Sequence, residues 1–140
     1  MGEHAGTIPT HYQGTRHEVQ NWIGGACGAA SETIENIDPA TGQSIGSVPD
    51  SSPADVDAAV DAATGAFDAW AGLSGEDRGA MLHALADAVE SDLDRFAHAE
   101  SVDSGKPISV ARTIDIPRSI RNLRFFAAAA SQFASERHDV

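Results

Sequence analysis

Apolar and polar residues alternate in the first third of the chain, and glycine-containing turns separate the alternating stretches. One turn signal is the pair Gly24-Gly25, and the other is the Asp-Pro-Ala-Thr-Gly stretch at 38–42. Glycine adopts the positive φ that tight turns need, and proline fixes φ next to it. We therefore predict β-hairpins over residues 19–50. Residues 1–18 are polar and lack periodicity, which predicts a mobile N-terminal arm.

Helical periodicity begins at residue 53 and continues to about residue 135. Ser52, Pro53 and Asp55 form a helix-start signal with an N-cap, a first-turn proline and an acidic residue at N3. Apolar residues then recur every three or four positions from Val56 to Trp70, which predicts one apolar stripe. Further signals predict helices that begin at Ser74, Ser91 and about Ile108, with an end at Gly105 and a bend near Pro117. In the second helix we expect Leu85 to face the core, and in the last helix Ile120, Leu123 and Phe126.

The composition describes an acidic protein with a thin apolar core. The chain has 140 residues and a net charge of −12, from 21 acidic and 9 basic residues. This charge argues against nucleic acid or an anionic membrane surface as a partner. Only 6% of the residues are aromatic and much of the apolar fraction is alanine, so we expect a layer that needs a neighbour. A single cysteine, Cys27, and the lack of a membrane-length or leader-like apolar run favour a cytoplasmic location.

Two turn signatures, Ile34 to Gly42 and Glu100 to Pro107, flank the first predicted helices. Together they resemble the N-terminal part of the NAD(P)-dependent aldehyde dehydrogenases, over roughly residues 20–137. The resemblance implies an α/β family fold, of which residues 19–140 form the outer, mainly α-helical part of the dinucleotide-binding domain. It also implies a homo-oligomeric enzyme that oxidises a small-molecule aldehyde with NAD or NADP. The family's catalytic cysteine, general-base glutamate and glycine loop lie downstream, so we expect this segment alone to be inactive.

The same resemblance implies a structural cation site. In many aldehyde dehydrogenases, Na⁺ or K⁺ is held by backbone carbonyls at the positions of Asn36 and Ile37 and by a carboxylate at the position of Asp103. Oxygen ligands of this kind are what a hard monovalent cation prefers. The alternative is that Asp103 only accepts backbone hydrogen bonds near the Gly105 turn.

Arg118 is the candidate substrate-binding residue. The stretch from Ile114 to Ala127 resembles the branch of the family that oxidises 2-aminomuconic and 2-hydroxymuconic semialdehydes. In that branch an arginine at the position of Arg118 lines the substrate tunnel and holds a carboxylate, to which a guanidinium presents two parallel N–H donors. The alternative is a surface arginine paired with Asp115 or with another carboxylate nearby.

Three other interpretations compete with these. Cys27 as a nucleophile lacks a nearby histidine or helix N-terminus that would lower its pKa, so we expect a small buried or edge thiol. Asp103 and Lys106 could be imagined as an acid–base pair, but both lie in a helix-ending turn and we expect a structural use. For the whole chain, the rivals to an enzyme segment are a truncated, non-catalytic binding or assembly module and a small helical protein whose similarity is accidental.

Overall fold

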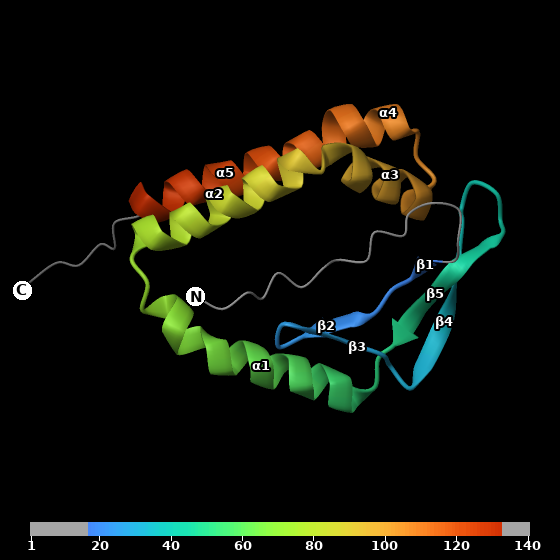
Figure 1. Ribbon diagram of the computed structural model, residues 1–140, viewed down its shortest axis with the longest axis horizontal. Coiled ribbons are helices and arrows are strands. Elements are labelled where there is room, and N and C mark those ends of the chain that lie inside the picture. Colours follow the sequence, from blue (N-terminus) through green and yellow to red (C-terminus); the bar gives the residue numbers. More distant parts are fainter. Residues whose placement is uncertain (1–16, 133–140) are drawn as a thin grey trace, which may run out of the picture.

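The structure is a computed structural model that describes residues 17–132, and it is mainly helical after an N-terminal β region (Figure 1). The predicted arm lies outside the described residues except for its last two, which form a short strand. In chain order the elements are β1 (His17–Glu18), β2 (Asn21–Ile23), β3 (Ala26–Gly28), β4 (Glu32–Ile37), β5 (Ser44–Asp50), α1 (Pro53–Ala71), α2 (Gly75–Ser91), α3 (Leu93–Ser104), α4 (Ile108–Val110), the π-helix η1 (Ala111–Asp115) and α5 (Ile116–Gln132). The expected fold class, helices preceded by β-hairpins, is confirmed.

The β region consists of two small sheets. β2 and β3 form a hairpin whose turn is Gly24-Gly25, with φ of 60° and 85°. β4 and β5 form a second antiparallel hairpin, and β1 adds to β5 in parallel. In the β4–β5 turn the Asp38 carboxylate accepts hydrogen bonds from the Ala40 N–H at 2.7 Å and the Thr41 hydroxyl at 2.9 Å. These bonds, chiefly the one from Ala40, lower the pKa of Asp38.

The predicted helix starts are confirmed for two helices and wrong for the third. The Ser52 hydroxyl accepts the Asp55 N–H and the Asp55 carboxylate accepts the Ser52 N–H, which makes the capping box of α1. Ser74 caps α2 in the predicted place. Ser91 does not cap α3, because its hydroxyl donates to the Ala88 carbonyl at 2.8 Å and so belongs to the last turn of α2.

Near Pro117, where the sequence predicts a bent or restarted helix, the structure has the π-helix η1. Pro117 has no N–H to donate, and its ring would clash with the carbonyl four residues earlier in a regular α-helix. The chain relieves both problems by widening the preceding turn, where the Ile116 N–H donates to the Ala111 carbonyl. The rod formed by α4, η1 and α5 therefore continues through the proline without a break (Figure 1).

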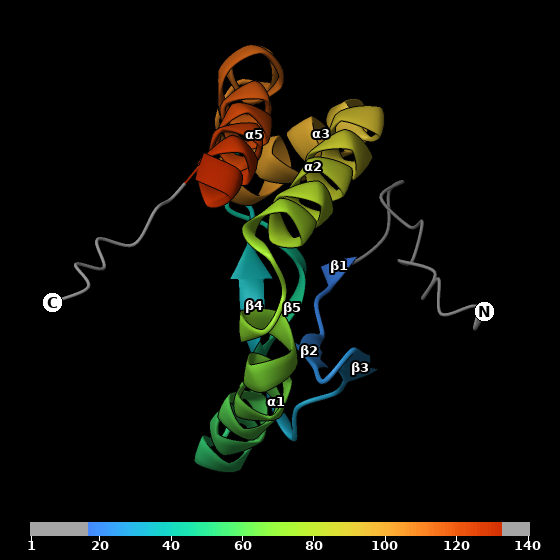
Figure 2. The ribbon, with the colours of Figure 1, turned by 90° about the vertical axis from the view of Figure 1, so that its left-hand side faces the viewer.

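The core lies between α2, α3, η1 and α5, and α2 and α5 pack side by side (Figures 1 and 2). A Cβ built on Gly79 would lie 2.7 Å from the Ala127 carbonyl oxygen, so the two backbones are in close contact. The alanine run that follows Phe126 thus allows a neighbouring helix to approach closely. The buried side chains are small apart from two isoleucines: Ala86, Ala97, Ala111, Ile116, Ile120 and Ala127.

Several large apolar side chains are exposed, as in a thin layer that needs a neighbour. The predicted stripe of α1 is present, but the described residues do not cover it, and Phe67 is 64% exposed. The inward placement predicted for Leu85 and Phe126 was wrong. The buried face of α5 follows Ile116, Ile120 and Ala127, which leaves Phe126 beside the contact, and alanine rather than leucine fills the α2 side. Among residues 17–132, no helix is long and apolar enough to cross a membrane.

Candidate substrate-tunnel wall and cation site

The two turn signatures of the sequence meet in the fold. Gly105 ends α3 in the left-handed conformation, with φ of 71°, and its N–H donates to the Ser101 carbonyl. A Cβ built on Gly105 would lie 2.9 Å from Cγ of Pro39 and 3.4 Å from the Ala40 nitrogen. The β4–β5 turn therefore rests against the end of α3, and only a residue without a side chain permits this approach.

A pocket of about 440 Å³ lies between the β4–β5 hairpin and α3. It brings together Asn36 of β4 and Asp103 of α3, two of the three predicted cation ligands. Ile37 follows Asn36 on β4 and lies outside the lining. The rest of the lining is mostly apolar: Val19, Ile45, Val48, Phe96, Ala99, Val102 and Ile116, with Glu100 as the other acidic residue.

The predicted cation ligands Asn36 and Ile37 lie at an irregular point of the β4–β5 hairpin. Asn36 pairs with Gly46 and Ile37 pairs with Ser44, so the extra residue of this register shift is Ile45 of β5. Among residues 17–132, no hydrogen bond to the Asp103 side chain is formed, because the Gly105 N–H donates to Ser101 instead. The alternative role of Asp103 as a turn acceptor is therefore not found. In the described part of the chain, no group of three or more His, Cys, Asp or Glu residues is placed to hold a metal ion, so backbone carbonyls would have to supply the other ligands.

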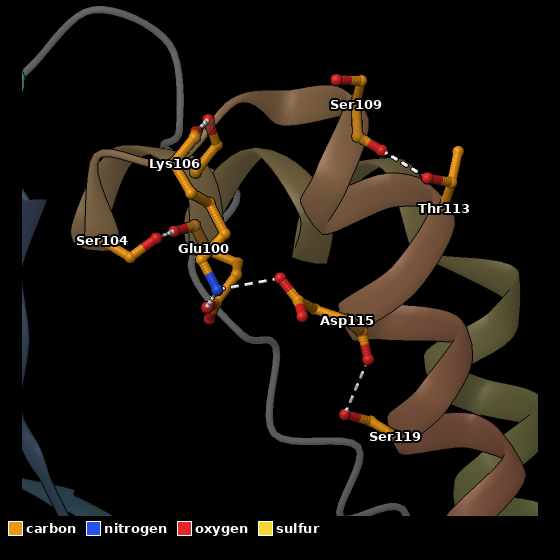
Figure 3. A network of polar contacts seen from close by, with 8 residues as sticks. Glu100, Ser104, Lys106, Ser109, Thr113, Asp115 and Ser119 are labelled. Carbon is orange, nitrogen blue, oxygen red and sulfur yellow. Dashed lines mark hydrogen bonds and ion pairs between the residues drawn. The ribbon is translucent and has the colours of Figure 1, made fainter.

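Lys106 is paired with two carboxylates and not with Asp103 (Figure 3). Its ammonium donates to Glu100 at 2.6 Å and to Asp115 at 2.8 Å. The hydrogen bond to Asp115, followed by the bond to Glu100, raises the pKa of Lys106. Sequence reasoning expected a structural use but missed both partners. The Lys106 ammonium thus connects Glu100 of α3 with Asp115 of η1. This connection positions the start of α5 relative to the pocket.

Arg118 lies exposed on α5, the one helix with several arginines and no acidic residue. Asp115, its suggested partner, is engaged by Lys106. Within residues 17–132, Arg118 pairs with no carboxylate, so the alternative of a surface ion pair is not found there. Arg124, two turns further along, behaves differently: it bridges to Asp87 and Glu90 of α2 at 2.8 and 2.6 Å, and its pKa is raised mainly by Glu90.

Arg121 is a second candidate anion-binding residue, which the sequence analysis missed. It lies one turn after Arg118, is exposed, and forms no ion pair within the described residues. Phe125 follows at the next turn and is 66% exposed, in edge-to-face contact with Phe126 at 5.3 Å between ring centres. The signal in the sequence was the absence of any acidic residue from 116 to 132. Cys27, by contrast, is an exposed thiol on β3.

The chain is similar to dehydrogenases of known specificity. It is 43% identical over 118 residues to 2-aminomuconic semialdehyde dehydrogenase of Mus musculus, a match that covers 84% of this chain and 24% of the relative. It is 42% identical over 122 residues to 2-hydroxymuconic semialdehyde dehydrogenase of Pseudomonas sp. strain CF600, with 85% and 25% covered. The chain thus spans about a quarter of the length of these relatives. Identity at this level removes the interpretation of an accidental similarity.

Solved structures agree with this relationship. The crystal structure of PnpE in complex with nicotinamide adenine dinucleotide superposes with a TM-score of 0.83 at 35% identity, covering 86% of this chain and 25% of the other. The NAD⁺ complex of an aldehyde dehydrogenase from Bacillus cereus superposes with a TM-score of 0.76 at 34% identity, covering 80% and 24%. The model of the aldehyde dehydrogenase family matches residues 27–140. The sequence, the fold and these matches together show that the chain belongs to the aldehyde dehydrogenase family.

Proposed function

We propose that this chain is the N-terminal segment of an enzyme that oxidises a carboxylate-bearing semialdehyde to the acid with NAD or NADP. The segment supplies scaffold and one wall of the substrate tunnel. The observation that carries this proposal is Arg118, an exposed guanidinium with no carboxylate partner in residues 17–132 of an acidic chain. The muconic semialdehyde specificity in the names of two relatives is consistent with it. Homo-oligomeric assembly and a cytoplasmic location stay predictions.

The segment's own contribution would be binding and positioning. A guanidinium on the tunnel wall holds the carboxylate end of the substrate, so the aldehyde end is directed away from the wall. The described residues contain no glycine-rich strand–turn–helix for a dinucleotide, so none of them is assigned to NAD or NADP. Cys27 lies on a two-stranded hairpin without a histidine or helix N-terminus beside it in the sequence, and we assign it no catalytic role.

The substrate role is tested by Arg118→Gln in the complete enzyme that contains this segment. Two aldehydes of equal length separate the effects: 6-oxohexanoate, which ends in a carboxylate, and hexanal, which does not. We expect kcat/KM for 6-oxohexanoate to fall about 10- to 100-fold, the range that corresponds to loss of a charge-assisted hydrogen bond, mainly through KM. Hexanal should change less than about twofold, because it makes no ionic contact with Arg118.

A matched control is Arg112→Gln, which removes the same charge from a surface ion pair with Asp94. It should leave the ratio of the two kcat/KM values unchanged. Equal losses for both aldehydes in Arg118→Gln, or an equal change of the ratio in the control, would contradict a carboxylate-binding role.

We also propose that the carbonyls of Asn36 and Ile37 and the carboxylate of Asp103 hold a structural Na⁺ or K⁺. Support comes from the pocket that Asn36 and Asp103 share and from the Asp103 carboxylate, which accepts no hydrogen bond in the described residues. The ion would join the β4–β5 hairpin to α3 and would have no part in the chemistry. Its ligands are carbonyl dipoles and one negative charge, which suit a monovalent cation better than a divalent one.

The cation proposal predicts an ion-specific stability. Thermal unfolding of the chain in NaCl or KCl should occur at a higher temperature than in choline chloride of equal ionic strength, because ligand binding to the native state stabilises it. Asp103→Asn should abolish this difference. Asp57→Asn, the same charge change on the exposed side of α1, should preserve it. A difference that survives Asp103→Asn would place the ion elsewhere.

A non-catalytic assembly module remains a second candidate, and the uncovered stripe of α1 is the observation that favours it. Val56, Val60 and Phe67 are each more than half exposed, and an apolar patch of this kind is unusual on the solvent-facing surface of a monomeric protein. A family member's remaining domains would cover this stripe equally well. Arg118 favours the enzyme, because a module that only assembles has no need of an unpaired guanidinium on α5.

A further inference from the structure

Resting on the proposed function, we propose that Arg121 is a second carboxylate-binding residue that acts together with Arg118. The two guanidinium groups form a clamp for the terminal carboxylate of the substrate, and Phe125 provides the apolar surface beside it. The clamp makes the enzyme selective for aldehydes that end in a carboxylate over neutral aldehydes of the same length. Arg121 is thereby a specificity-determining residue.

The distribution of charge isolates this pair. Helix α5 contains three arginines and no acidic residue, in a chain of net charge −12. Among the described residues, every other arginine and the lysine already have a partner. Carboxylates bind Arg95, Lys106, Arg112 and Arg124, and the carbonyls of Ala71 and Leu73 accept from Arg78. Only Arg118 and Arg121 lack such a partner within residues 17–132, and they are neighbours on one helix. An anionic ligand is repelled by most of this surface and attracted here.

The helical spacing lets both arginines reach one ligand. Residues three apart on an α-helix have Cβ atoms about 5–6 Å apart, and each arginine side chain is longer than that separation. Two guanidinium groups can therefore meet on the oxygens of one carboxylate, each donating two hydrogen bonds. Neither side chain needs to break an existing ion pair to do so, since Asp115 is held by Lys106 and the α2 carboxylates by Arg124.

Phe125 extends the same face. It follows Arg118 by seven residues, which is nearly two full turns, so it projects along the line of the two arginines. Its ring is 66% exposed and is held edge-to-face by Phe126 at an interplanar angle of 80°. A hydrocarbon chain whose carboxylate is bound by the arginines has this ring as an apolar surface to lie against.

The test compares Arg121→Gln, Arg121→Lys and Arg118→Gln in the complete enzyme, with 6-oxohexanoate and hexanal as substrates. We expect Arg121→Gln to lower kcat/KM for 6-oxohexanoate about tenfold, mainly through KM, and to leave hexanal within about twofold. Arg121→Lys keeps the positive charge but lacks the two parallel N–H donors of a guanidinium. Its kcat/KM for 6-oxohexanoate should therefore lie between those of the parent enzyme and Arg121→Gln. In the double variant Arg118→Gln/Arg121→Gln, the fold-loss of kcat/KM for 6-oxohexanoate should be smaller than the product of the two single fold-losses, because both groups hold one carboxylate.

The unfolding temperatures of the variants and of the parent enzyme separate an effect on substrate binding from an effect on folding. Arg121 makes no ion pair in the described residues, so Arg121→Gln should melt like the parent enzyme. If Arg121→Gln changes both aldehydes equally, or neither, while Arg118→Gln still loses selectivity, the clamp is refuted and the proposed function stands. If the enzyme oxidises hexanal but shows no preference for 6-oxohexanoate, and neither variant alters that, the proposed function and the clamp both fall.

Discussion

Gly79→Ala is expected to lower the free energy of unfolding of this chain by about 2 kcal/mol, the size typical of overpacking a tight contact. The new Cβ would lie 2.7 Å from the Ala127 carbonyl oxygen, and that oxygen is backbone and has no rotamer with which to move aside. Alanine also favours helix over glycine by about 0.5–1 kcal/mol, so the measured loss is a net value. Gly75→Ala should act in the same direction, since its Cβ would clash with the Ala130 carbonyl oxygen.

The matched control is Gly65→Ala in the interior of α1. A Cβ there meets nothing within 4 Å, so only the helix preference remains and stability should rise by about 0.5–1 kcal/mol. Chemical denaturation followed by circular dichroism gives both values from the same analysis. If Gly79→Ala and Gly65→Ala shift stability in the same direction, the close α2–α5 contact does not exist in solution.

Gly105→Ala is expected to destabilise the chain by about 2–3 kcal/mol, through backbone strain and a clash together. Gly105 has φ of 71°, a conformation that costs an L-residue about 1–2 kcal/mol. Its new Cβ would also lie 2.9 Å from Cγ of Pro39, so the β4–β5 turn has to move away from α3. The measurement is again the free energy of unfolding from denaturant titration.

Gly42→Ala separates the two contributions. Gly42 has φ of 70° and a Cβ there meets nothing within 4 Å, so it reports the backbone strain alone. The extra loss in Gly105→Ala then measures the contact between the turn and the helix end. Adding Pro39→Ala should recover part of that extra loss, because it removes the Cγ atom. Equal losses for Gly105→Ala and Gly42→Ala would mean that the two turns do not touch.

Local signals predicted the elements of this fold well, because capping and turn chemistry act within a few residues. The Ser52 capping box, the Gly24-Gly25 turn and the end of α3 at Gly105 all lie where the sequence places them. The widening before Pro117 was predicted only as a bend. Its π-helical form depends on which carbonyl the Ile116 N–H selects, and no residue type specifies that choice.

Long-range contacts were the part that the sequence did not reveal. Phe126 belongs to an apolar pattern, yet the contact with α2 is so close that only the line through Ile120 and Ala127 is buried. The partners of Lys106 come from residues six positions before it and nine after it, on different elements. Arg121 stands out only when the partners of every other cation are known. Arg118, by contrast, was predicted from the sequence through the branch of the family that its helix resembles, and its role stays a prediction.

The claim that this segment supplies scaffold and tunnel wall but no catalytic group is tested most directly with the purified 140-residue chain. The measurement is aldehyde-dependent reduction of NAD⁺ or NADP⁺. We predict no turnover of 6-oxohexanoate or hexanal above the rate without protein, since Cys27 is the only thiol and lies outside any catalytic arrangement. Turnover that is present in the parent chain and lost in Cys27→Ala would contradict the account, because the chemistry would then reside in residues assigned here to scaffold and tunnel wall.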